Sequence, residues 1–218
     1  MKAVLLDAKP ASRDIIIDHL KIKDDVKVPD IKNDEVLVKV EATALNIEDI
    51  MIACGWRFGT ALTATKEKPL VLGQEFSGTV AKVGSKVKSF SVGDKVLAHK
   101  LPVRVRDGSW AEFVNIKHSE LVTKPDSYSW AQAAAIPMQC KVAWGAVIDA
   151  GFSKLPVLDS LSHKTLDPAT VEVVVDTENK ALSTLTGTNM DKINEAKVAV
   201  VGASSTTGLM VVDMLVSR

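Results

Sequence analysis

The sequence is short of cysteine, of aromatic residues and of long apolar runs, and its charges cancel. The two cysteines, Cys54 and Cys140, are too few for a disulfide framework or a four-cysteine zinc site. Twenty-seven basic and 27 acidic residues give a net charge of zero, which argues against general nucleic-acid binding. No stretch reaches the roughly 18 apolar residues of a membrane span, and the apolar start before Asp7 is too short for a signal peptide. We therefore expect a soluble, cytoplasmic protein without a membrane span.

The length and composition indicate a globular chain of more than one domain. The 218 residues are 46% hydrophobic and 25% charged, with 12 glycines and 8 prolines, which excludes a collagen-like or wholly disordered chain. At about 150 residues a domain, the length corresponds to about one and a half domains. We therefore expect one nearly complete domain and part of a second.

Short strands separated by turns are predicted over most of the first 122 residues. Val36, Val38 and Val40 alternate with other residues at the period of a half-buried strand. Further strands, each bounded by a glycine turn, are predicted at Phe76–Val83, Val92–Val96 and Trp110–Ile116. Several short strands of this kind favour a small, closed all-β unit.

Helices are predicted after Pro125. Ser129 can cap a helix over residues 130–136, which Pro137 interrupts. A second, apolar helix is predicted over residues 142–150. We assign residues 1–150 to one domain, made of the strands and these linking helices.

The rest of the chain divides into a polar segment and a strand–turn–helix unit. Residues 151–196 are rich in serine and threonine and are predicted to form a loop-rich insertion. Val198–Val201 is typical of a buried parallel strand, a small-residue turn follows over 202–208, and 209–216 has a helical pattern. Such a unit opens a dinucleotide-binding fold, in which the helix N-terminus faces the pyrophosphate. Ala203, Ser205 and Gly208 occupy the three glycine positions. An ordinary strand-to-helix turn is therefore the open alternative.

Several ordered motifs resemble the medium-chain dehydrogenase/reductase superfamily. They are Ala44–Asp49, Gly73–Gly78, Val83–Gly84, Gly93–Val96, Gly108–Phe113 and Ala133–Pro137, followed by the turn at 202–208. Their order and spacing are similar to those of the zinc-independent quinone oxidoreductase and enoyl reductase branch. The resemblance implies a fold between α+β and α/β: a GroES-like β-barrel catalytic domain at 1–150, then at 197–218 the first βα unit of an incomplete Rossmann fold.

The same resemblance bears on metals and on site residues. Zinc-dependent relatives carry a cysteine where this chain has Asn46 and a histidine where it has Gln74. Because an amide is not a usual zinc ligand, no zinc is expected. The resemblance implies that Asn46 and Asp49 are catalytic residues, which line the cleft near nicotinamide and substrate. The alternative is that both only stabilise a turn at the end of a strand. Glu75 matches a family position as well, where a structural carboxylate is expected.

The reaction implied by the resemblance is hydride transfer from NADPH to a small electron-poor substrate, a quinone or an enone. Gly202, Ala203, Ser204 and Gly208 are expected to bind the cofactor. Since a βαβ unit takes roughly 30 residues and 22 remain from Lys197, we expect the 218 residues alone to bind NADPH weakly. The alternative function is a non-catalytic, reductase-like scaffold in protein interaction or trafficking. A homodimer is left open.

Overall fold

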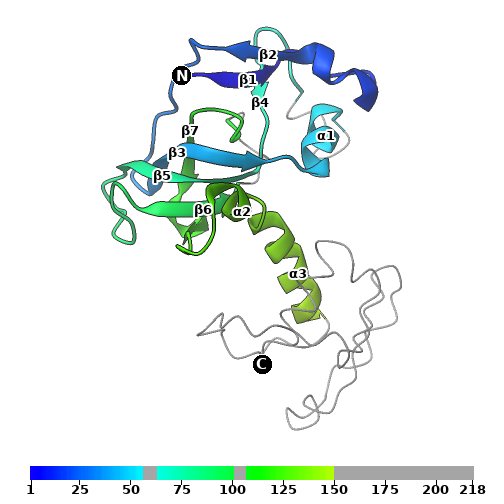
Figure 1. Ribbon diagram of the computed structural model, residues 1–218. Coiled ribbons are helices and arrows are strands. Elements are labelled where there is room, and N and C mark those ends of the chain that lie inside the picture. Colours follow the sequence, from blue (N-terminus) through cyan, green and yellow to red (C-terminus); the bar gives the residue numbers. More distant parts are fainter. Residues whose placement is uncertain (56–62, 101–106, 150–218) are drawn as a thin grey trace, which may run out of the picture. The chain divides into compact units, whose positions relative to one another are not determined.

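The computed structural model describes residues 1–55, 63–100 and 107–149 (Figure 1). The chain divides into two units, Met1–Pro137 and Met138–Arg218. Every strand described lies in the first unit. The described part of the second unit belongs to helix α3 (Pro137–Asp149).

A five-stranded antiparallel sheet forms the larger part of the first unit. Its strands are β3 (Glu35–Ala44), β5 (Glu75–Val83), β6 (Lys95–His99), β7 (Phe113–Lys117) and β8 (Leu121–Thr123). They lie in the order β7-β3-β5-β6-β8 (Figure 1). The long pair β3 and β5 runs from Val36 opposite Val83 to Ala44 opposite Glu75, with two register shifts. The end of β3 therefore lies beside the start of β5.

A smaller sheet contains the N-terminal strand. It is formed by β1 (Ala3–Leu6), β2 (Leu20–Lys23) and β4 (Leu70–Val71), in the order β2-β1-β4. The backbone N–H of Val4 donates to the carbonyl of Trp110 at 2.8 Å, and Ala3 forms an isolated bridge with Ala111. The segment before β7 thus joins the two sheets.

Each sheet packs its own cluster of buried side chains. The larger cluster takes alternate residues from all five strands, as expected where one face of a sheet is buried. Phe76 is its largest fully buried side chain, and such burial contributes about 1.5–3 kcal/mol. The smaller cluster joins Leu6 and Leu70 to Ile52 of helix α1 (Ile47–Ala53).

The two shortest α-helices described, α1 and α2 (Trp130–Ala134), begin at polar caps. In α2, Ser129 Oγ accepts from the backbone N–H of Gln132 at 3.2 Å, while Gln132 Oε1 accepts from the N–H of Ser129 at 2.9 Å. The hydroxyl of Ser77 donates to the carbonyl of Trp130 at 2.6 Å, so α2 covers part of β5. Within the described ranges, the 3₁₀ helices are η1 (Arg13–Ile15), η2 (Ile17–His19) and η5 (His118–Glu120). No helix among the described residues is long and apolar enough to cross a membrane.

The strands predicted at 36–40 and 76–83 and the cap at Ser129 are confirmed. The strand expected at Val92–Val96 begins only at Lys95, because Gly93 has φ +97° and turns the chain before it. The strand expected from Trp110 begins at Phe113, because the residues before it pair with the smaller sheet. The sequence favoured one small, closed all-β unit. In the structure, the described strands of this unit are divided between two sheets.

The helical part also differs from expectation. The first helix ends at Ala134, two residues before its expected end. Pro137 begins α3 instead of interrupting a helix, in agreement with the preference of proline for a first helical position. The expected insertion at 151–196 and the strand–turn–helix unit at 197–218 lie outside the described residues.

Candidate functional site

Asn46 lies where β3 ends and α1 begins, beside the start of β5. Its side-chain Oδ1 accepts from the backbone N–H of Glu48 at 3.1 Å, and its own backbone N–H donates to Asp49 Oδ2 at 2.9 Å. This reciprocal pair is a capping box, which satisfies the free N–H groups at the start of the helix. The turn-stabilising role considered for the two residues is therefore present in the structure.

Asp49 links α1 to a second segment of the chain. Its Oδ1 accepts from the backbone N–H of Gly73 at 3.2 Å, so both carboxyl oxygens bind backbone N–H groups. The side chain is only 2% exposed. Burial raises the pKa of this carboxyl, while the hydrogen bonds from Asn46 and Gly73 act against the rise. This geometry suits a positioning residue.

Asn46 has a further contact that the cap does not require. Its Nδ2 donates to Glu75 Oε2 at 3.2 Å, and Glu75 is buried at the first position of β5. The backbone of Glu75 is fixed in turn, because its carbonyl accepts from the hydroxyls of Thr43 at 2.7 Å and Ser109 at 3.1 Å. The carboxylate thereby orients the Asn46 amide. Since an amide carries two N–H donors, a second one is left for a ligand.

Gln74 precedes Glu75 and is 1% exposed. Within the described part of the chain, neither its Nε2 nor its Oε1 has a partner in hydrogen-bonding geometry. The amide lies near Asp49, whose pKa it helps to lower. Its backbone carbonyl accepts from the N–H of Lys100 at 2.7 Å. Gln74 is therefore a buried amide on a fixed backbone. In the sequence, the only signal for it was the departure from histidine.

The turn before Gln74 is clamped to the segment before β7. The N–H groups of Gly108, Ser109 and Trp110 donate to the carbonyls of Val71, Gly73 and Leu72, each at 2.9 Å. Gly73 has φ +96°, and a Cβ there would lie 2.3 Å from Trp110 Cδ1. Only glycine allows this approach.

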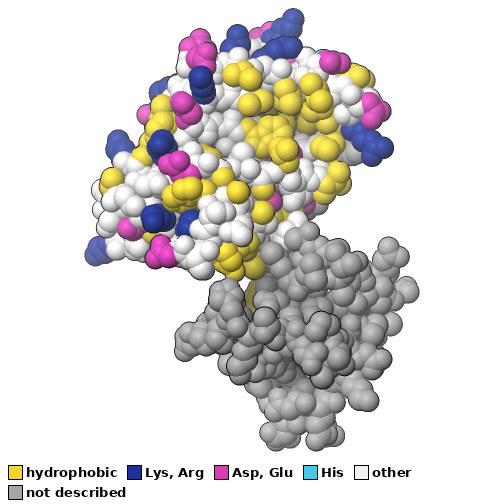
Figure 2. Space-filling view, viewed as in Figure 1, with side chains coloured by type: hydrophobic (Ala, Val, Ile, Leu, Met, Phe, Trp, Pro, Cys, Tyr) yellow, Lys and Arg dark blue, Asp and Glu magenta, His cyan; other side chains and the backbone are white. Residues whose placement is uncertain are grey.

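Two exposed apolar side chains flank Asn46. Leu45 is 80% exposed and Ile47 is 63% exposed. Figure 2 shows that hydrophobic side chains also gather at the surface of this unit where Figure 1 draws β1, β4 and α1. The capped helix start thus combines a polar amide with an apolar rim, formed by Leu45 and Ile47.

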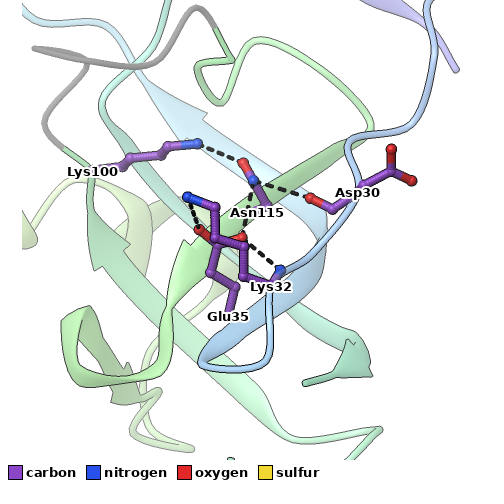
Figure 3. A network of polar contacts seen from close by, with 5 residues as sticks. All are labelled: Asp30, Lys32, Glu35, Lys100 and Asn115. Carbon is purple, nitrogen blue, oxygen red and sulfur yellow. Dashed lines mark hydrogen bonds and ion pairs between the residues drawn. The ribbon is translucent and has the colours of Figure 1, made fainter. Parts of the chain in front are cut away.

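Lys100 is the buried cation nearest in sequence to the site. Its Nζ donates to the carbonyl of Asp107 at 2.7 Å and to Asn115 Oδ1 at 2.8 Å. Figure 3 shows Asn115 continuing this network to Glu35 and to the carbonyl of Asp30. Burial lowers the pKa of Lys100 to about 8, against the raising effect of nearby carboxylates. Through these two hydrogen bonds, Lys100, which follows β6, is joined to Asp107 and to Asn115 of β7.

The predicted cofactor residues Gly202, Ala203, Ser204 and Gly208 lie outside the described residues. Among the residues that are described, no group of three or more His, Cys, Asp or Glu is arranged to hold a metal ion. The amides at positions 46 and 74 do not suit zinc, which prefers thiolate, imidazole or carboxylate ligands.

Comparison with known proteins gives a consistent result. Residues 32–126 match the alcohol dehydrogenase GroES-like domain. The chain is 38% identical over 141 residues to the 2-methylene-furan-3-one reductase of Solanum lycopersicum, covering 63% of this chain and 35% of that protein. It is 36% identical over 141 residues to the chloroplastic NADPH-dependent alkenal/one oxidoreductase of Arabidopsis thaliana, covering 63% of this chain and 36% of that protein. The solved quinone oxidoreductase of Coxiella burnetii superposes with a TM-score of 0.60 at 29% identity, over 69% of this chain and 45% of that one.

Residues 32–126 thus match an alcohol dehydrogenase GroES-like domain, and the chain is similar to proteins of the medium-chain dehydrogenase/reductase superfamily. The names of these relatives agree with the resemblance to the quinone oxidoreductase and enoyl reductase branch, and the matched GroES-like domain lies within the first unit. The chain spans about a third of the length of the two curated relatives. A cytoplasmic location stays a prediction, since one of these relatives is named as chloroplastic.

Proposed function

We propose that this chain carries the catalytic domain of an NADPH-dependent reductase that acts on enones or quinones. The observation that carries the proposal is the pair of amides, Asn46 and Gln74, at the end of β3 and before the start of β5. Neutral amide donors suit a substrate that gains negative charge on an oxygen. The names of the two curated relatives, which reduce a furanone and alkenals or enones, support the same substrate class.

Each residue of the site has a distinct role in this proposal. Asn46 directs one amide N–H toward the substrate while Glu75 holds the other. Asp49 positions the helix start and the Gly73 turn relative to each other and does not contact the substrate. When bound, NADPH supplies the hydride, and Gly202, Ala203, Ser204 and Gly208 would hold its pyrophosphate.

The apolar rim suits the carbon skeleton of such substrates. Leu45 and Ile47 expose most of their side chains on either side of Asn46. An enone or quinone ring that covered them would remove apolar surface from water, at about 25 cal/mol per Å². The rim thereby selects apolar acceptors, while the amides select those with a carbonyl oxygen.

The test uses protein expressed from the complete coding sequence of the gene. NADPH oxidation is followed with 2-cyclohexenone and with 1,4-benzoquinone. Asn46→Ser keeps a good helix cap but lacks the amide, so we expect kcat/KM to fall about 10-fold to 100-fold with little change in melting temperature.

The matched control is Asn33→Ser, in an exposed turn, where we expect unchanged kinetics. A folded protein that oxidises NADPH with neither acceptor would contradict the proposal. Binding of NADPH without turnover would favour the scaffold function instead.

A further inference from the structure

The Gln74 amide is a buried polar group that lies near the Asp49 carboxyl without a hydrogen bond of good geometry to it. In the described part of the chain, its nitrogen and its oxygen both lack a hydrogen-bond partner, although the side chain is 1% exposed. Burying an amide without a partner is unfavourable, and most buried polar groups in native proteins are hydrogen-bonded. An apolar side chain of the same length would fill this position without that penalty. The amide therefore points to a ligand.

We propose that Gln74 receives the carbonyl oxygen of the substrate, as the donor that selects carbonyl-bearing acceptors. This inference rests on the proposed reductase function and adds a specificity-determining residue to it. Nε2 offers two N–H donors, so an acceptor such as the nearby Asp49 carboxyl that takes one of them leaves the other for a ligand. Asn46, one of whose amide N–H groups is held by Glu75, supplies the second donor.

The backbone around Gln74 is held from several directions, which favours a preorganised donor. The Gln74 carbonyl accepts from Lys100, and the N–H of the preceding Gly73 donates to Asp49. The carbonyl of Gly73 accepts from Ser109. A donor fixed in this way needs no rearrangement when charge develops on the ligand, which is the condition for electrostatic stabilisation of a transition state.

The reduction places charge on the oxygen that Gln74 would bind. The β-carbon of an enone gains the hydride of NADPH, which is oxidised to NADP⁺, and the electron pair of the carbon–carbon double bond shifts toward the carbonyl oxygen. The Gln74 N–H groups stabilise the negative oxygen without transferring a proton. A proton from water then reaches the α-carbon, so the product is the saturated ketone.

Gln74→Met tests this role, because methionine keeps the length of the side chain and removes the amide. We expect kcat/KM for 2-cyclohexenone to fall about 100-fold, as for the loss of one oxyanion donor. The control is Gln132→Met, the same change at a glutamine that caps α2. There the melting temperature falls and kcat/KM stays unchanged.

A second measurement does not depend on turnover. The side-chain amide signal of Gln74, assigned by its loss in Gln74→Met, is followed by NMR in the full chain. We expect 2-cyclohexenone to shift this signal, and cyclohexene, which lacks the oxygen, to leave it in place. An unmoved signal, or unchanged kcat/KM in Gln74→Met with an active wild type, would overturn the inference. An inactive wild type whose signal still shifts with the ketone would instead contradict only the proposed function.

Discussion

The Asp49 carboxyl accepts a hydrogen bond from the backbone N–H of Gly73 at 3.2 Å, across 24 positions of sequence. Its other oxygen caps α1 through Asn46. A single buried side chain thus connects the element that carries the Asn46 amide with the turn that carries the Gln74 amide. The spacing of the two proposed donors depends on this link.

Asp49→Asn breaks this link while keeping the size of the side chain. Asparagine has a single acceptor oxygen, so it can satisfy the N–H of Asn46 or of Gly73 but not both. We expect a loss of about 1–2 kcal/mol in the free energy of unfolding, measured by urea denaturation. The control is Asp94→Asn, where one oxygen still serves the N–H of Ser91. Equal losses in the two variants would contradict the proposed role of Asp49.

The variants Gly73→Ala and Gly93→Ala test two separate reasons why a glycine is required. One is the positive φ of the backbone, and the other is the lack of room for a Cβ atom. The two glycines have nearly the same positive φ, +96° and +97°. A Cβ on Gly93 meets nothing within 4 Å, whereas one on Gly73 would lie 2.3 Å from Trp110 Cδ1 and 2.8 Å from the Trp110 backbone nitrogen. We expect about 1–2 kcal/mol of destabilisation for Gly93→Ala and about 3 kcal/mol or more for Gly73→Ala. Similar melting temperatures for the two variants would contradict this expectation, because the close contact of the Cβ with Trp110 would then add no destabilisation.

The sequence predicted the framework better than the site. Alternating valines identified β3, and the Ser129 cap identified α2, because both signals are local. Helix α1 was not predicted, since seven residues give too little periodicity, although an asparagine followed three residues later by an acid is a cap signal. The link between Asp49 and Gly73 depends on tertiary packing. The same holds for the burial of the Gln74 amide beside Asp49, which no local pattern could reveal.

Lys100 predicts a pH dependence of stability in the alkaline range. Burial lowers its pKa to about 8 in the folded protein, below the ordinary lysine value of 10.5. Between these values the unfolded chain binds more protons than the folded one, so this group makes stability rise with pH. The gain is on the order of 3 kcal/mol across the window. We expect wild type to gain stability relative to Lys100→Met from pH 8 to 10.5.

Denaturant unfolding at several pH values measures this difference. Lys86→Met, at an exposed lysine, serves as the control and should follow the wild-type profile. A wild-type and a Lys100→Met profile that stay parallel across the window would contradict a buried Lys100 in this network (Figure 3).

The central claim is that amide donors, and no metal, receive the substrate oxygen in the proposed reductase. The most direct measurement is NADPH oxidation by 2-cyclohexenone in protein from the complete coding sequence, dialysed against a chelator, for wild type and Gln74→Met. We predict that dialysis leaves the wild-type rate unchanged and that Gln74→Met lowers kcat/KM about 100-fold. A folded wild type without NADPH-dependent reduction, or one whose activity returns only on addition of zinc, would contradict the claim.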